Sequence, residues 1–336
     1  MTTSVTRTAV PSYAELRERT DAPAGSSWGL FGPVDQLGML NFLTEERTAA
    51  AAGLVKRGAT FNLDYPLNTF VPSLAGTRPP TEHRIFANNP NHRDDWVDSF
   101  YLQSTSQVDG LRHIRHPKHG FYGGVPDENV DVGKPDLGIQ LLAEKGIAGR
   151  GVLLDAVAYF ASIGEPLEFG TMRRITPQDL DAIAEFGRVR VRPGDIVLLH
   201  TGYSAEWVRL TPEERLARRG TGGTGLDQSE DMLAWLWDHQ VAMMAADNGG
   251  LESFPVRTDS GWVDPDEPLP ERGPSHNGMM HRPIIALLGL IIGELWKLDE
   301  LAADCAADGV YEFLLTAKPL NLLGGVGSPP NAIAVK

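Results

Sequence analysis

The chain has little cysteine, no excess of basic charge and no long hydrophobic run. Cys305 is the single cysteine, so no disulfide can form within the chain, and we predict a buried packing role for it in an alanine-rich helix. The 30 Lys and Arg residues are outnumbered by 44 Asp and Glu residues. The formal net charge of -14 argues against nucleic acid or an anionic membrane surface as a partner. The longest apolar run, residues 284–293, is too short to span a bilayer.

The N-terminal segment also lacks a feature, namely the apolar core of a secretion signal. We therefore expect a cytoplasmic protein in which residues 1–27 are a polar leader with a short helix. Residues 28–336 are expected to form a single domain, because no internal repeat or interior linker divides them.

Alternation of strand and helix patterns from residue 149 onward indicates the fold class. An apolar strand ends at Asp155, a capped helix runs from Thr176 to Gly187, and a second strand ends at His200. A helix at residues 229–240 and a strand at 241–248 follow. This order predicts an α/β core with a partly parallel sheet. Asp155, His200 and Asp247 sit at strand ends, either as ligand groups or as hydrogen-bond anchors.

Residues 68–97 are rich in Pro, Asn, Arg and Asp and show no periodicity. A stretch of this length inside a domain is typical of a functional loop or lid. We predict such a loop here.

A polar cluster at residues 103–124 is the first candidate site. Gln107 and Asp109 are two residues apart, so an extended chain puts both side chains on one face. Gly110 permits a bend that lets His113 turn back toward them, with Gln103 just upstream. Amide, carboxylate and imidazole groups together suit metal binding or acid–base catalysis, and they also suit a solvated polar loop.

A second polar group lies at residues 276–301. His281 opens an apolar segment and Glu294 closes it. A carboxylate beside so apolar a run is either paired or bound, because an isolated buried charge costs several kcal/mol. The alternative is that Glu294 starts a surface helix with Asp299 and Glu300.

The two groups combined contain oxygen and nitrogen ligands and no thiolate. Such a set suits Zn²⁺ or Mn²⁺ with one position open for water. The metal would lower the pKa of that water to about 7 and polarise a carbonyl. We therefore expect a metal-bound hydroxide to hydrolyse an amide, imide or lactone, with an unbound His or Glu carrying the proton.

Several spaced motifs resemble the cyclase superfamily, which includes bacterial kynurenine formamidase, isatin hydrolase and trans-dienelactone hydrolase. The likeness is strongest to its longer members and covers most of the chain. The matching residues are Trp28-Gly29, Gly32-Pro33, Asp35, Gly38, Asn41, Gln107-Val108-Asp109-Gly110-Leu111, His113, Phe121-Tyr122, Gly194-Asp195, His281 and Gly293-Glu294.

The resemblance implies an α/β protein with the swivelling β/β/α fold and a mixed sheet, assembled as a homodimer or homotetramer. It implies that Asp109, His281 and Glu294 bind a divalent metal, and that His113 is the catalytic acid and base. Two signature histidines of the formamidase-like members correspond to Gln103 and Gln107 here.

This departure changes the expected metal site. An amide oxygen is a weaker and harder ligand than imidazole, so one ion, Mn²⁺ or Zn²⁺, is expected, with Gln107 among its ligands. His113 could also join the ligands, which would leave Glu294 as a catalytic residue.

Aromatic residues near both groups are candidates for the substrate pocket. We assign Trp28, Phe31, Tyr122 and Gln103 to substrate binding, while core packing is the alternative for the aromatic ones. The expected enzyme is thus a metal-dependent hydrolase of a small cyclic or aromatic amide, imide or lactone. The alternatives are a metal-free lyase, isomerase or cyclase using Asp109 and His113, or a non-catalytic binding protein of the same fold.

Overall fold

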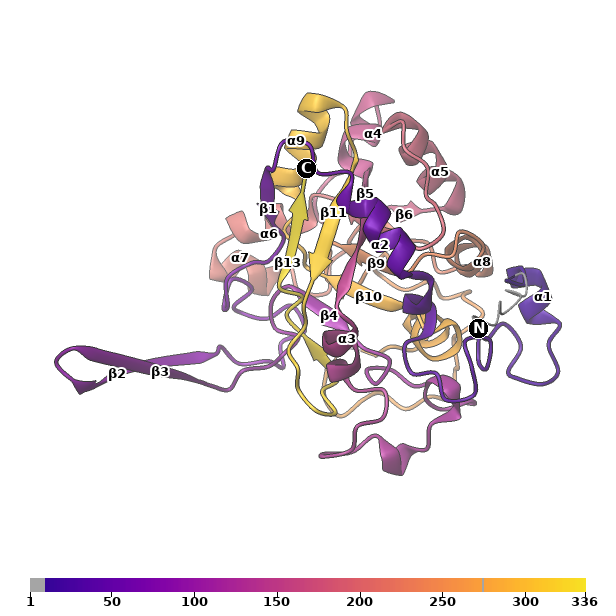
Figure 1. Cartoon of the computed structure of the whole chain (residues 1–336), viewed down its shortest axis with the longest axis horizontal. Helices are drawn as coiled ribbons and strands as arrows, with labels where there is room; N and C mark the ends of the chain where they lie inside the picture. Colours follow the sequence, from indigo (N-terminus) through magenta and orange to yellow (C-terminus); the bar gives the residue numbers. More distant parts are fainter. Residues whose placement is uncertain (1–9, 274) are drawn as a thin grey trace, which may run out of the picture.

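A large mixed sheet organises the chain in the computed structural model, which describes residues 10–273 and 275–336 (Figure 1). Its nine strands lie in the order β1-β13-β11-β5-β7-β9-β10-β4-β12. Strands β5, β7, β9 and β10 are parallel, and the flanking strands on both sides pair in antiparallel fashion. The predicted α/β class with a mixed, partly parallel sheet is therefore confirmed.

The strands of this sheet are β1 (Thr60–Asn62), β4 (Gln107–Asp109), β5 (Ile147–Asp155), β7 (Ile196–His200), β9 (Met243–Ala246), β10 (Ile291–Glu294), β11 (Glu312–Ala317), β12 (Gly327–Ser328) and β13 (Ala332–Val335). The longer helices are α1 (Tyr13–Arg17), α2 (Glu45–Ala52), α3 (Ile139–Lys145), α4 (Ala156–Ser162), α5 (Pro177–Phe186), α6 (Tyr203–Arg209), α7 (Pro212–Ala217), α8 (Glu230–Asp238) and α9 (Asp299–Asp308). Two short strands, β6 (Arg174–Ile175) and β8 (Gly225–Leu226), pair with each other outside the sheet.

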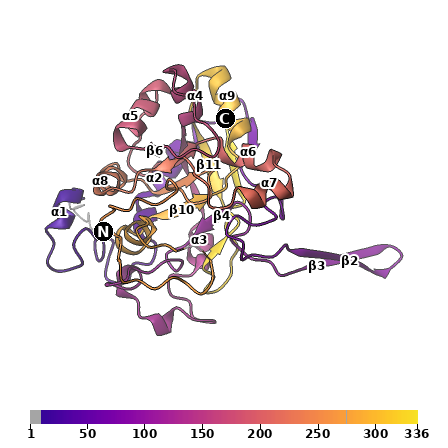
Figure 2. The ribbon, with the colours of Figure 1, turned by 180° about the vertical axis from the view of Figure 1, so that it is seen from behind.

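Helices cover both faces of the sheet. Helix α2 lies in front of β5 and β11 in Figure 1, whereas α6 and α7 are nearest the viewer from behind in Figure 2. The central strands are buried almost along their whole length, and every residue of β7 is buried. Apolar burial on both faces explains the continuous apolar runs that predict these strands.

Capping side chains set the helix starts that the sequence predicts. Thr176 accepts a hydrogen bond from the backbone N–H of Asp179, and the Asp179 carboxylate accepts one from the backbone N–H of Thr176. This capping box starts α5 where expected. Asp155 ends β5 and caps α4 through the N–H of Ala158 (3.1 Å).

The N-terminal segment is joined to the body. Residues 1–9 of the predicted leader lie outside the described residues. Helix α1 begins after the Ser12 capping box, and Tyr13 and Leu16 are buried in the main core. The backbone N–H of Tyr13 donates to Asp238 at the end of α8 (2.7 Å). The division into a leader and one domain stays a prediction.

The predicted loop at residues 68–97 is wrong in its second half. A two-stranded arm, β2 (Glu82–Asn89) and β3 (His92–Asp98), projects from the body to the left in Figure 1. Every residue of both strands is exposed. Since neither face of the arm is buried, its sequence carries no alternation of apolar and polar residues.

None of the helices in the described part of the chain is long and apolar enough to cross a membrane.

Candidate metal centre and cavity

The pairing of β4 with β10 brings the two polar groups of the sequence together. Glu294 lies opposite Gln107, and Ile292 lies opposite Asp109, in an antiparallel register. Side chains two residues apart in a strand share a face. Gln107, Asp109 and Glu294 therefore point to the same side of the sheet, although 187 positions separate Gln107 from Glu294.

A close backbone approach makes this pairing possible at Gly293. A Cβ added there would lie 2.6 Å from the Trp296 indole nitrogen and 2.7 Å from the Ala245 Cβ. Without it, the buried Trp296 ring lies over the strands and donates a hydrogen bond to the Gln107 carbonyl oxygen (2.9 Å). Glu294 is thus buried in a strand, which excludes the alternative that it starts a surface helix.

His281 comes to the same place from the start of a π-helical turn, η4 (Arg282–Leu288). Such turns are frequent at functional sites. The loop that follows α1 holds this turn from outside. Trp28 donates to the Ala286 carbonyl oxygen (2.8 Å) and Ser27 to that of Leu288 (2.9 Å).

Glu252 fixes the His281 ring, and the sequence interpretation missed it. Its carboxylate accepts the backbone N–H groups of Met280 and His281 (2.7 Å each) and also pairs with His281 Nδ1. With Nδ1 carrying the hydrogen, Nε2 faces Glu294 Oε1 at 3.0 Å. A carboxylate that orients a ligand histidine in this way is common around bound metals. Its only sequence signal is a lone Glu in the small and apolar stretch 249–254.

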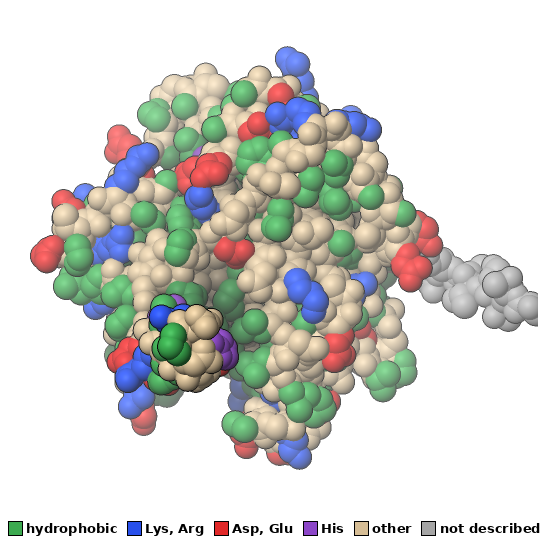
Figure 3. All heavy atoms as spheres, turned by 60° about the vertical axis from the view of Figure 1, so that its left-hand side comes forward, with side chains coloured by type: hydrophobic (Ala, Val, Ile, Leu, Met, Phe, Trp, Pro, Cys, Tyr) green, Lys and Arg blue, Asp and Glu red, His purple; other side chains and the backbone are tan. Residues whose placement is uncertain are grey.

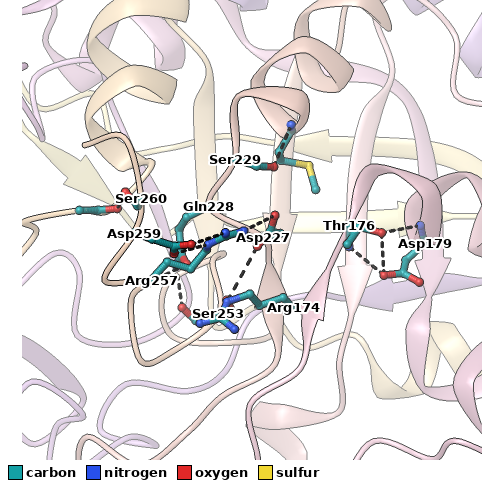
Figure 4. Close-up of polar contacts among 12 residues, drawn as sticks. Arg174, Thr176, Asp179, Asp227, Gln228, Ser229, Ser253, Arg257, Asp259 and Ser260 are labelled. Carbon is teal, nitrogen blue, oxygen red and sulfur yellow. Dashed lines mark hydrogen bonds and ion pairs between the residues drawn. The ribbon is translucent and has the colours of Figure 1, made fainter. Parts of the chain in front are cut away.

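A polar network holds the loop that carries Glu252. The backbone N–H of Ser253 donates to the carbonyl oxygen of Leu226 in β8 (3.0 Å). Arg257 reaches back to Asp227, with Nη1 3.0 Å from its carboxylate, as Figure 4 shows. Asp227 directly follows β8, so the backbone hydrogen bond and the ion pair tie this loop to the same short strand.

The groups that converge fit a divalent cation. Ligand atoms of Asp109, His281 and Glu294 lie within 4.8 Å of one another, and all three residues are buried. Asp109 Oδ2 has no hydrogen-bond partner among the described residues. A buried oxygen without a partner, beside an imidazole nitrogen and a second carboxylate, is the donor set that Mn²⁺ and Zn²⁺ accept.

The electrostatics of the site point the same way. Burial raises the pKa of Asp109, and the neighbouring Glu294 carboxylate adds to that rise. Burial acts to lower the pKa of His281, but Glu252 and Glu294 overcome it and raise the pKa to about 10. The carboxylates thus attract positive charge, which a bound cation would supply.

The two glutamines and His113 surround this triad. Gln103 Nε2 donates to Asp109 Oδ1 and lies 3.2 Å from His113 Nδ1, so its amide links these two side chains. His113 Nε2 lies 3.5 Å from Asp109 Oδ2. Gln107 donates its N–H to Glu294 Oε2 (2.6 Å) and turns its oxygen toward Arg78. In this arrangement the Gln107 N–H supports a carboxylate, and its ligand role stays a prediction.

A cavity of about 540 Å³ opens above the triad. Gln103, Gln107, His113, His281 and Glu294 all line it. Its apolar wall is a small cluster separate from the main core, formed by Phe70, Trp207 and Leu295. Figure 3 looks at this side of the molecule, with the arm pointing toward the viewer and a recess beside its base.

The aromatic residues assigned to substrate binding lie away from this cavity in the single chain, and the assignment stays a prediction. Trp28, Phe31 and Tyr122 do not line the cavity. Phe31 packs edge-on against Phe42, with ring centroids 5.1 Å apart. Tyr122 is buried and donates to Asp35 (2.9 Å). These rings hold the N-terminal loop against the body.

The strand-end residues form a second buried polar cluster. His200 Nδ1 lies 2.9 Å from Asp155 Oδ1, and Nε2 lies 3.5 Å from Asp299 Oδ1. Asp247 accepts the backbone N–H groups of Thr201 and the next residue (2.7 Å each). None of these residues lines the cavity, and their hydrogen bonds hold the ends of the strands and the start of α4.

The His200 cluster predicts a pH-dependent stability. Burial acts to lower the pKa of His200, but Asp155, Asp299 and Asp247 raise it to about 10. The stabilisation is full below the unfolded pKa of about 6.5 and is lost as the pH rises through about 10. We expect His200→Gln to lower the free energy of unfolding by a few kcal/mol at pH 6, at about 1.4 kcal/mol per pKa unit, and by much less at pH 10.

Urea unfolding of both proteins across this range measures the effect. The exposed His92 in β3 provides a control, His92→Gln, that should leave the curve unchanged. A difference between His200→Gln and the parent that stays constant with pH would contradict the charged, carboxylate-paired state of His200.

Comparisons with known proteins show the family of the chain. The Cyclase family model, described as "Putative cyclase", matches residues 61–253. A crystal structure described as that of a novel cyclase shares 33% sequence identity, with 93% of this chain and 99% of that chain covered and a TM-score of 0.79. No curated protein sequence matches the chain.

Isatin hydrolases share the fold at lower identity. Isatin hydrolase A from Ralstonia solanacearum is 18% identical, with a TM-score of 0.55 over 86% of this chain and 96% of that one. The Labrenzia aggregata enzyme bound to benzyl benzoate is 16% identical, with a TM-score of 0.54 over 85% and 96%. The fold that the sequence resemblance implies is therefore confirmed.

Proposed function

Because the chain belongs to the Cyclase family, we propose that it is a metal-dependent hydrolase that cleaves a small cyclic or aromatic amide, imide or lactone at its carbonyl carbon. One observation carries the proposal. Asp109, His281 and Glu294 come from separate segments of the chain, yet their ligand atoms lie within 4.8 Å of one another next to a cavity. The reaction class is the one for which the isatin hydrolases are named.

Asp109, His281 and Glu294 would hold one divalent ion, Mn²⁺ or Zn²⁺. When bound, such an ion polarises a carbonyl and lowers the pKa of water. Glu252 keeps His281 Nε2 directed at the site, and Gln107 holds the Glu294 carboxylate. The Gln103 amide contacts both Asp109 and His113 and so fixes the position of one side chain relative to the other.

His113 is proposed as the proton carrier. It lines the cavity and has 17% of its side chain exposed, so a substrate can reach it while Asp109 stays buried beneath. Its Nε2 can take a proton from the attacking water and return it to the leaving nitrogen or oxygen. The apolar wall around Phe70 and Trp207 limits the water available for side reactions.

Metal content tests the proposal most directly. Elemental analysis of the full chain, purified without added metal, is expected to find about one Mn or Zn per chain, and Asp109→Asn is expected to lose it. Hydrolysis of a panel of cyclic amides, imides and lactones should stop on exhaustive chelation and return with Mn²⁺ or Zn²⁺. Activity that survives chelation would instead favour the metal-free acid–base alternative.

A homodimer or homotetramer is part of the proposal, and the arm supports it. A two-stranded hairpin is marginally stable on its own in water. Ile85 and Trp96 are 66% and 47% exposed on this one. Light scattering of the full chain is expected to give a multiple of its 36.5 kDa mass, and Ile85→Asp with Trp96→Asp to give the monomer. A monomeric parent protein would contradict this.

A further inference from the structure

Arginines gather at the cavity although the protein as a whole is acidic. Arg78, Arg218, Arg219 and Arg272 all line the cavity, in a chain of net charge -14. None of the four forms an ion pair with a carboxylate in the described part of the chain. Other arginines there, such as Arg150, Arg173 and Arg257, do form such pairs. Arginines without a carboxylate partner at one cavity leave guanidinium groups available to attract an anion.

Two of these arginines are fixed by the same residue. The buried Ser73 accepts the backbone N–H of Arg78 through its hydroxyl (3.3 Å) and the Arg219 Nε–H through its carbonyl oxygen (3.1 Å). Arg78 also donates to the Gln103 carbonyl oxygen. Neither Arg219 Nη1 nor Nη2 has a hydrogen-bond partner among the described residues. Both guanidinium groups are thus held at the cavity with donors to spare.

The wall that carries Ser73 is itself tied down. Arg215 is buried in α7 and donates to the carbonyl oxygens of Thr69 (2.7 Å) and Val71 (2.8 Å). It binds Trp207 and Val208 through their carbonyl oxygens as well. Arg78 and Arg219 therefore belong to a braced wall, which favours binding because fewer groups must be ordered when a ligand arrives.

Three kinds of residue line the cavity. His113, His281 and Glu294 represent the candidate metal centre. Arg78 lies 3.5 Å from Gln107 Oε1, and Gln107 in turn touches Glu294, so two polar contacts connect the arginine wall to the triad. The apolar side chains of Phe70, Leu74 and Trp207 line the space beside them.

We propose that the substrate carries a carboxylate away from the carbonyl that is cleaved, and that Arg219 and Arg78 bind this carboxylate. The inference rests on the proposed function for the identity of the cleaved group. Arginine presents paired N–H donors that match the two oxygens of a carboxylate. The ring of the substrate would lie against the apolar wall, and Arg218 and Arg272 would attract the anion at the opening.

Equilibrium binding tests the arginine site without requiring turnover. Benzoate and its uncharged counterpart benzamide are titrated calorimetrically into the metal-loaded full chain. We expect benzoate to bind at least about tenfold more tightly than benzamide, and Arg219→Gln to remove about that factor from benzoate alone. Arg219→Lys should recover part of it. Arg209→Gln is the matched control, because Arg209 forms an exposed pair with Glu206 in α6.

Each result decides the matter. Benzoate affinity that is equal in the parent and in Arg219→Gln would place the carboxylate on the metal and overturn the proposal. Equal binding of both compounds, or of neither at millimolar concentration, would overturn it too. Where a lactone or imide pair with and without a carboxylate is hydrolysed, Arg219→Gln should raise KM for the acid with kcat unchanged. If the parent protein hydrolyses none of the compounds but still binds benzoate in a way that depends on Arg219, the proposed reaction is rejected and the anion site is retained.

Discussion

Replacing His281 by alanine is expected to lower the affinity for Mn²⁺ or Zn²⁺ by about 100-fold or more and to abolish hydrolysis. His281 is the single imidazole of the triad, and the remaining carboxylates bind a divalent ion less selectively. Glu252→Gln should have a smaller effect, a loss of about 10- to 100-fold in metal affinity, because it orients the ring without touching the ion. A larger loss of metal affinity in His281→Ala than in Glu252→Gln would identify His281 as the ligand and Glu252 as the residue that orients it.

Calorimetric titration of metal into each variant measures this, and urea unfolding with and without metal checks the fold. His281→Ala leaves the buried Glu252 carboxylate with backbone donors alone, so a loss of about 3–5 kcal/mol in the free energy of unfolding is expected. His281→Gln keeps most of the volume and is the second variant should the first fail to fold. Parent-like metal affinity in a folded His281→Gln would exclude the proposed centre.

Local sequence patterns predict the central elements well. The capped helix α5 and the buried strands β5 and β7 follow from apolar runs, capping residues and turn glycines that act over a few positions. The prediction for the two-stranded arm was wrong for the opposite reason. Its strands β2 and β3 bury neither face, so the physical cause of a strand pattern is missing.

The candidate site could be predicted only in part. Gln107 and Asp109 share a face because they are two residues apart in one strand, which spacing alone indicates. Their meeting with Glu294 depends on the β4–β10 pairing, and that with His281 on the start of η4; the resemblance implied these partners, and periodicity could not. Roles in ligand binding stay predictions, since geometry alone assigns no metal.

The roles of Glu252, Arg78 and Arg219 could not be predicted from residue type alone. Glu252 acts by accepting backbone N–H groups from a segment 28 or 29 positions away. Arg78 and Arg219 are 141 positions apart in the sequence, yet both donate a hydrogen bond to Ser73. Conversely, Trp28 and Tyr122 are aromatic and near the motifs, yet they pack, because an aromatic ring serves a core and a pocket equally well.

Replacing His113 by alanine is expected to lower kcat by about 100- to 10,000-fold while about one metal ion per chain remains bound. His113 Nε2 lies 3.5 Å from Asp109 Oδ2, and its other ring nitrogen, Nδ1, lies 3.2 Å from Gln103 Nε2. A proton carrier fixed in this way can be removed without opening the triad. With Gln103 and Gln107 in place of the signature histidines, His113 lines the cavity beside the triad, and the His276 ring lies next to it (centroids 6.2 Å apart).

Metal stoichiometry and turnover measured on the same His113→Ala sample separate the two possible roles. Added imidazole should restore part of the activity, because the truncated side chain leaves room for it at the cavity wall. His116→Ala is the control, since His116 lies three positions on, outside the cavity, with its pKa lowered to about 4 by burial. Loss of the ion in parallel with turnover, and no rescue by imidazole, would make His113 a ligand and move the proton transfer to Glu294.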